Sequence, residues 1–266
     1  MRIFGWKGRM AVERWETAAA DFLLAWTSRN DVIGAMLCGS YITGNPSRRS
    51  DVDIHLILSE DAENRERGNL VRGGLMIEYF LNPAQQIRAY FRQDFEARST
   101  MSMVQFATGR IVYDPTGVTN ALKAEAKQWL AKEREGLSGA ELELAKYAVW
   151  DDMDNVLDSF EQRKPDYPFV CQQAMMRLFQ TYSRFLQLAS TPHHHVLAYL
   201  KDPRYLGKYL APPFPDEEFA RKMVRLIQDN DPYRQVQEYE QLVQHVLREM
   251  GGFDPNGWHL RTPLSL

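Results

Sequence analysis

The chain has 266 residues, of which 44% are hydrophobic and 25% are charged, and its formal net charge is −3. This length accommodates two domains, and the composition is ordinary for a globular protein. The basic runs at 48–49 and 65–67 are too short and interrupted to grip a nucleic-acid backbone. We therefore expect no long nucleic acid as a partner, whereas small-molecule and protein acceptors stay open.

The sequence contains neither an apolar run of membrane-spanning length nor a recognisable export signal. Residues 1–14 carry basic side chains without the apolar core of a signal peptide. Cys38 and Cys171 lie in apolar surroundings without metal-ligand spacing, so we interpret both as small buried hydrophobes. We expect a cytoplasmic protein with no membrane partner.

The N-terminal part of the chain predicts a small domain with a mixed sheet. The expected strands span 32–38, 52–58, 74–81 and 109–115. Apolar side chains at helical spacing predict helices at 11–28 and 83–95, and the polar segment 59–69 is expected to be a loop. We assign this domain to residues 1–117.

After residue 117 the pattern becomes helical, which predicts an all-helical bundle over 118–250 and an irregular tail over 251–266. The expected helices span 119–135, 139–163, 167–190, 194–201, 215–229 and 232–250. Their recurring Met and aromatic residues are interpreted as bundle core. The predicted fold class is therefore α+β, with a mixed-sheet domain followed by a helical bundle.

The segment from Gly39 to Asp53, which joins two predicted strands, is the most informative part of the sequence. Side chains two residues apart on a strand share a face, so Asp51 and Asp53 converge while Val52 faces a core. Two charged carboxylates at close range favour a cation between them, and Mg²⁺ binds through carboxylates and substrate phosphates. The alternative is a turn cap and a surface acid.

The start of the same segment has features of a phosphate-binding turn. Gly39 would let the backbone approach a phosphate without a Cβ atom, and Ser40 could cap a short helix and donate to the phosphate. Ser50 could orient Asp51. A phosphate-binding turn beside metal-binding acids is what phosphoryl or nucleotidyl transfer requires.

The pattern Gly-Ser, three residues, Gly, five residues, Ser-Asp-x-Asp resembles the signature of the polymerase β-like nucleotidyltransferase superfamily. Its spacing is most similar to that of small bacterial antibiotic nucleotidyltransferases, and the likeness covers the domain at 1–117. The resemblance implies a third acid on a later strand, for which Glu78 is the candidate; the alternative is an edge-strand acid facing water. It also implies Mg²⁺, an NTP such as ATP as co-substrate, and an acceptor held between the two domains.

On this resemblance, Asp51, Asp53 and Glu78 are the expected catalytic and metal-binding residues, with Glu78 as general base. The expected nucleotide contacts are Gly39, Ser40, Ser50 and Lys146. Lys146 is the first candidate for a helical-domain cation that binds the triphosphate, and Arg177 is the second. His55 shares the face of the two aspartates and is given no role.

One face of the helix expected at 139–163 carries Tyr147, Asp151, Asp154 and Asp158 at helical spacing. Two interpretations stay open for this face. It is either an ordinary solvated surface or an acidic wall for a cationic acceptor such as an aminoglycoside.

The sequence therefore predicts a Mg²⁺-dependent enzyme that transfers a nucleoside monophosphate from an NTP to a hydroxyl of a small molecule, releasing pyrophosphate. Two alternatives stay open: an enzyme that nucleotidylates a protein, and a non-catalytic nucleotide-binding or antitoxin-like partner. The intact pair of aspartates argues against the second alternative. The sequence makes no prediction of oligomeric state.

Overall fold

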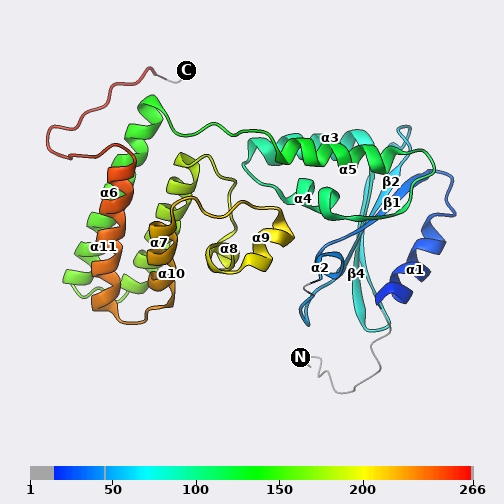
Figure 1. Ribbon diagram of the computed structural model, residues 1–266, viewed down its shortest axis with the longest axis horizontal. Helices are drawn as coiled ribbons and strands as arrows, with labels where there is room; N and C mark the ends of the chain where they lie inside the picture. Colours follow the sequence, from blue (N-terminus) through cyan, green and yellow to red (C-terminus); the bar gives the residue numbers. More distant parts are fainter. Residues whose placement is uncertain (1–14, 45, 265–266) are drawn as a thin grey trace. The chain divides into compact units, whose positions relative to one another are not determined.

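The computed structural model describes residues 15–44 and 46–264 (Figure 1). The chain divides into two compact units, Met1–Lys132 and Glu133–Leu266. The first unit combines a mixed sheet with helices. In the described residues of the second unit, the regular elements are all helices. The expected α+β class is confirmed, whereas the expectation about a leader over 1–14 lies outside the described residues.

Within the described residues, the first unit has a five-stranded sheet in the order β3-β4-β2-β1-β5. The strands are β1 (Val32–Cys38), β2 (Val52–Leu58), β3 (Glu66–Arg72), β4 (Leu75–Pro83) and β5 (Arg110–Tyr113). Strand β2 is central, because it pairs antiparallel with β1 and parallel with β4. Side chains at the ends of these three strands are therefore neighbours in the middle of the sheet.

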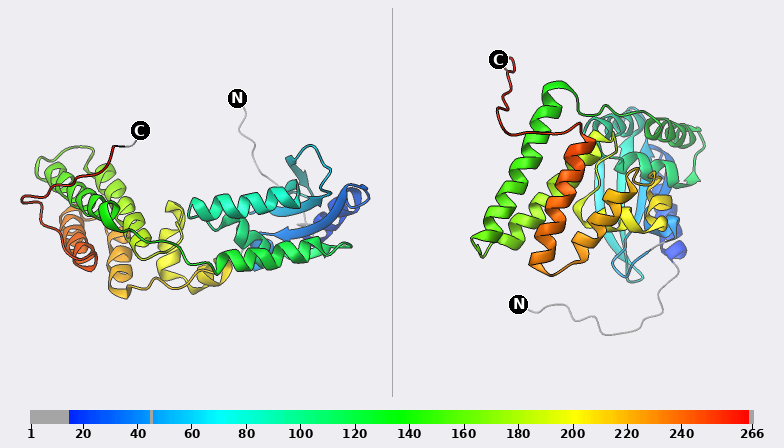
Figure 2. Two further views of the ribbon diagram at one scale, coloured as in Figure 1. Left: turned by 90° about the horizontal axis from the view of Figure 1, so that it is seen from above. Right: turned by 60° about the vertical axis from the view of Figure 1, so that its left-hand side comes forward.

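Helices cover both faces of this sheet (Figures 1 and 2). Helix α1 (Trp15–Trp26) packs on one face, with Phe22 among the core residues. The other face is covered by α3 (Ala84–Glu96), α4 (Met101–Thr108) and α5 (Val118–Leu130). Because both faces are buried, β1 and β2 consist of nearly continuous apolar residues, which is why the sequence indicates them so clearly.

Strand β3 corrects the expectation of a loop over 59–69. It pairs residue by residue with β4 through the turn at Gly73–Gly74, whose φ angles of 57° and 81° are the positive values that a two-residue hairpin turn needs. The strand was missed because it is an exposed edge, so charged, Gly and Asn residues replace the apolar run that signals a buried strand.

Helix α5 places the division between the units later than the expected boundary at 117. Leu122 and Ala126 are fully buried in the core that α5 shares with α3, α4 and the sheet. The first unit therefore ends at Lys132, after this helix. The boundary was predicted too early because few residues of α5 are buried, and such a short apolar stripe does not distinguish a helix that packs on a sheet from a helix of a bundle.

The second unit contains six α-helices within its described residues. They are α6 (Gly139–Glu161), α7 (Tyr167–Phe185), α8 (Val196–Lys201), α9 (Pro203–Tyr209), α10 (Glu217–Gln228) and α11 (Pro232–Glu249). Their buried core includes Val156, Phe179 and Leu242. Helix α9 was not expected from the sequence, whereas the tail after residue 250 is irregular as expected. None of the helices described in either unit has the length and apolarity that a membrane span needs.

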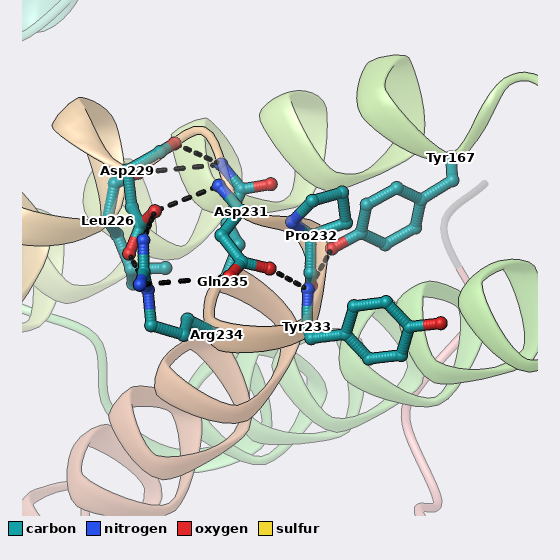
Figure 3. Close-up of polar contacts among 8 residues, drawn as sticks. All are labelled: Tyr167, Leu226, Asp229, Asp231, Pro232, Tyr233, Arg234 and Gln235. Atoms are coloured by element: carbon teal, nitrogen blue, oxygen red, sulfur yellow. Dashed lines mark hydrogen bonds and ion pairs between the residues drawn. The ribbon is translucent and has the colours of Figure 1, made fainter.

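The connection between α10 and α11 is held by a compact set of hydrogen bonds (Figure 3). Asp229 accepts two bonds from the Arg234 guanidinium, at 2.9 and 3.0 Å, and Asp231 caps α11 by accepting from the Tyr233 N–H at 3.0 Å. The Arg234 contact is the main reason why the pKa of Asp229 falls to about 2. Tyr167 on α7 donates to the Pro232 carbonyl at 3.3 Å and so ties this turn to a third helix.

Asp216 connects three helices of the second unit. As the N-cap of α10 it accepts from the Phe219 N–H at 2.9 Å, and it also bonds Tyr182 on α7 and His245 on α11, both at 2.7 Å. Burial by itself raises the pKa of Asp216, but the bonds from Phe219, His245 and Tyr182 outweigh it and hold the pKa below 3.8. The ionised carboxylate therefore stabilises the packed helices.

Replacing Asp216 with Ala is expected to destabilise the second unit by about 3 kcal/mol, because a cap is lost and two buried donors lose their acceptor. The depressed pKa adds a pH dependence. The stabilisation is fully present above about pH 4 and declines as the pH falls through the lower folded-state value. Hydrogen exchange of the α10 and α11 amides measures both effects. Asp202→Ala, which removes the more exposed cap of α9, is the control and should cost no more than about 1 kcal/mol.

Candidate active site

The turn after β1 brings the main chain directly against a carboxylate. Gly39 has φ 75° and ψ −161°, a conformation that is essentially restricted to glycine. A Cβ atom at this position would lie 1.9 Å from the Asp53 carboxylate oxygen Oδ2. Residue 39 must therefore be glycine for two independent reasons, its backbone angles and the close approach of Asp53.

The short helix α2 (Ser40–Thr43) follows, and it ends at Gly44 with a left-handed φ of 88°. Its N-cap is Gly39, whose carbonyl accepts from the N–H groups of Ile42 and Thr43. The expectation that Ser40 caps this helix is therefore wrong. Ser40 is the first residue inside the helix, with its side chain partly exposed beside the end of β1.

Three acids on or next to two neighbouring strands converge beside this turn. Asp51 precedes β2, Asp53 lies on β2, and Glu78 lies on β4 directly opposite Asp53 in the parallel pairing. Carboxylate oxygens of the three residues all lie within 4.8 Å of one another, and each residue is half-buried. Val52 and Ile54 point to the opposite, buried face, as the period of a strand predicts.

The arrangement of these acids fits a divalent cation. With Mg–O bonds of about 2.1 Å, an octahedral Mg²⁺ ion holds oxygens about 4.2 Å apart on opposite sides and about 3.0 Å apart at adjacent positions. Oxygens that already lie within 4.8 Å of one another therefore need to move closer by at most about 2 Å to share one ion. Among the described residues, no other group of acids, histidines or cysteines converges in this way.

A cation that the sequence analysis missed lies beside the acids. Arg67 on β3 donates from Nη2 to the Glu78 oxygen Oε1 at 2.5 Å, and its guanidinium lies 4.9 Å from the centre of the Phe80 ring. Arg67 was missed because its segment was interpreted as a loop. The Gly73–Gly74 pair is the signal that could have indicated a hairpin and therefore placed Arg67 beside β4.

Ser50 belongs to the turn that leads into β2 rather than to the acids. Its hydroxyl accepts from the Ser47 N–H at 2.8 Å and lies 3.3 Å from the Ser47 hydroxyl. This contact shapes the chain immediately before Asp51. The contacts of Ser50 with Asp51 and with nucleotide that the sequence suggested stay predictions.

Two further side chains on the same sheet face are uncharged neighbours of the acids. Burial lowers the pKa of His55 to about 4, and its ring stacks on Phe80 with centroids 4.9 Å apart. Burial, together with the charge of Asp53, raises the pKa of the Cys38 thiol. His55 is therefore neutral at pH 7 and Cys38 is a protonated thiol, as expected for a buried hydrophobe.

The two cations proposed from the helical unit both have acidic partners within that unit. Lys146 on α6 is buried and bonds Glu143 at 2.8 Å, and Arg177 on α7 forms a two-pronged ion pair with Asp152. Either residue would have to exchange its partner to reach a triphosphate. Both stay predictions from the sequence.

The acidic face of α6 is partly neutralised within its own unit. Asp158 pairs with Lys164 at 2.6 Å, and Asp151 accepts from Asn155 at 3.1 Å, whereas Asp154 is exposed. Tyr147 on the same face stacks on Trp258 of the tail, with ring centroids 4.5 Å apart. These contacts give the ordinary solvated-surface interpretation more support than the acidic-wall interpretation.

Comparison with known proteins adds little to this picture. No family model matches the chain, and no curated protein matches it significantly. Among solved structures, the chain is similar to the crystal structure of a nucleotidyltransferase-like protein from Exiguobacterium sibiricum 255-15, with a TM-score of 0.42 and 11% identity. The match covers 88% of this chain and 75% of that one. Because this TM-score is low, we infer the function from the side chains described above.

Replacing Gly39 with Ala is expected to push the Asp53 carboxylate away from the other acids. Affinity for Mn²⁺ should fall about tenfold to a hundredfold, the usual effect of disturbing the support of a metal ligand. The first unit should also lose roughly 1–3 kcal/mol of stability from the backbone strain. Isothermal titration with Mn²⁺ and urea unfolding measure the two effects.

Gly44→Ala is the matched control for this variant. Its φ is also positive, but a Cβ there would meet nothing within 4 Å. It should cost roughly 1–2 kcal/mol of stability and leave Mn²⁺ affinity unchanged. Equal losses of affinity in the two variants would show that strain alone, rather than contact with Asp53, explains the effect.

Proposed function

We propose that this protein is a divalent-metal-dependent nucleotidyltransferase that moves a nucleoside monophosphate from an NTP, with ATP as the first candidate, to a hydroxyl of a small molecule. The observation that carries the proposal is the convergence of Asp51, Asp53 and Glu78 beside the Gly39 turn. Carboxylate ligands for a metal and a close backbone turn for phosphate are the two components that this chemistry needs.

Asp51 and Asp53 would hold the metal, for which Mg²⁺ is the first candidate. When bound, the ion neutralises charge on the triphosphate and the leaving group and lowers the pKa of the attacking hydroxyl. The protein's contribution is to hold both carboxylates in place. Pairing of β2 with its two neighbours holds Asp53, and the turn closed by Ser47 and Ser50 holds Asp51.

Glu78 is proposed as the general base as well as a metal ligand. In the reaction the acceptor oxygen attacks the α-phosphorus, its proton passes to the Glu78 carboxylate, and the bond from that phosphorus to the bridging oxygen of pyrophosphate breaks. Glu78 suits this role because it is half-buried and lies directly opposite Asp53. The pairing of β2 with β4 therefore already places the proposed base next to the proposed metal ligands.

A small hydroxyl compound is proposed as the acceptor. The chain carries a net charge of −3 and no continuous basic run, which disfavours long nucleic acid. An aminoglycoside-like polycation is the first candidate because of the resemblance to antibiotic nucleotidyltransferases.

Mass spectrometry tests the reaction directly. The purified protein is incubated with Mg²⁺, each of the four NTPs, and a panel of aminoglycosides and lincosamides. The expected result is an acceptor whose mass increases by one nucleoside monophosphate, together with release of pyrophosphate. A mass increase on a protein would instead support protein nucleotidylation. Hydrolysis and transfer both absent, with NTP bound, would support the non-catalytic alternative.

Variants of the three acids distinguish their roles. Asp51→Asn and Asp53→Asn should reduce transfer by about 10³-fold or more, because the charge stabilisation that a metal supplies is worth several kcal/mol. Both should also reduce the rise in melting temperature that Mg²⁺ and NTP produce. Glu78→Gln should slow transfer by about 10²–10⁴-fold while nucleotide binding persists. Wild-type turnover in both aspartate variants would contradict the site assignment.

A further inference from the structure

Arg67 and Glu78 form an ion pair at the edge of the acid cluster, and the two partners differ greatly in exposure. The Arg67 side chain is 68% exposed and that of Glu78 is 18% exposed. In the pairing of β3 with β4, Arg67 lies opposite Phe80, one position along the same face from Glu78. A solvent-facing cation therefore reaches inward to the acid of the cluster that lies on the neighbouring strand β4.

Stacking holds the guanidinium of Arg67 in this position. Phe80 lies between Arg67 on β3 and His55 on β2, with the guanidinium 4.9 Å and the His55 ring 4.9 Å from its centre. His55 is itself buried and makes an edge-to-face contact with the Phe106 ring. The ring of Phe80 is thus fixed from the side of β2, and it provides a platform that favours the orientation of Arg67 toward Glu78.

The charge of Arg67 has opposite consequences for two possible ligands. A free divalent cation between the three acids would compete with the guanidinium for Glu78 and be repelled by it. A metal–NTP complex carries a net negative charge, so the same guanidinium attracts it. Removing the positive charge should therefore strengthen one binding event and weaken the other.

Building on the proposed function, we propose that Arg67 is a resident counter-cation that weakens binding of free divalent metal and favours metal that arrives with the nucleotide. Arg67 is then a positioning residue for Glu78. It also determines the order of loading, by which we mean that the metal binds together with the nucleotide rather than before it. Because the pair is largely exposed on the Arg67 side, the effect is modest, about fivefold in each affinity.

Arg67→Met tests this inference, since Met retains much of the length of the side chain and removes the charge. Free Mn²⁺ is titrated with electron paramagnetic resonance, and Mn²⁺ with a non-hydrolysable ATP analogue is titrated by calorimetry. Arg67→Met should bind free Mn²⁺ about fivefold more tightly and the Mn²⁺–nucleotide complex about fivefold more weakly. Arg67→Lys, which keeps the charge, should lie closer to the wild type in both.

Arg72→Met is the matched control. Arg72 lies on the same strand and its partner is Asp21, at 3.3 Å, so the variant removes the same charge away from Glu78. It should change neither affinity by more than about twofold. Circular dichroism and the melting temperature check that each variant is folded.

The outcomes separate this inference from the proposed function. If the wild type binds Mn²⁺ and Asp53→Asn does not, but Arg67→Met binds free Mn²⁺ no more tightly than the wild type, only the counter-cation inference fails. Tighter binding of both ligands, or of free Mn²⁺ alone, overturns the order of loading. If neither wild type nor Asp53→Asn binds Mn²⁺, the metal site itself is wrong, and the inference fails with it.

Discussion

The site depends on the pairing of β2 with both of its neighbours. In one row across the sheet, Cys38 on β1, Asp53 on β2 and Glu78 on β4 lie side by side. A shift of one residue in either pairing would turn an acid to the opposite face, because successive side chains of a strand alternate. The apolar side chains on both faces of β2 resist such a shift, so the hydrophobic core determines where the carboxylates meet.

Close packing at the end of β1 adds a second constraint. The Gly39 backbone lies against the Asp53 carboxylate, and only the absence of a Cβ atom allows that approach. The acids are consequently confined between the glycine turn and the sheet. Arg67 offsets part of their negative charge from the exposed edge. These tertiary contacts hold the three carboxylates close together in spite of their mutual repulsion. A cluster of this kind is suited to binding a cation.

How much of the site could be predicted depends on how local its determinants are. Asp51 and Asp53 follow from the period of a single strand. Glu78 was chosen because the family resemblance implies a third acid and Glu78 is a single acid in an apolar strand, so all three were identified before any pairing was known. Arg67 could not be identified in the same way. It lies on an exposed edge strand whose partner, rather than its own composition, determines that it is a strand.

The sequence by itself determined the α+β class, the buried strands and the pair of aspartates, because core burial and strand alternation leave direct periodic patterns. Only the tertiary structure decided that the Gly39 backbone lies against the Asp53 carboxylate, that α5 belongs to the first unit, and that Arg67 reaches Glu78. The physical reason is that these features arise from contacts between segments far apart in the chain, and such contacts leave no period within either segment.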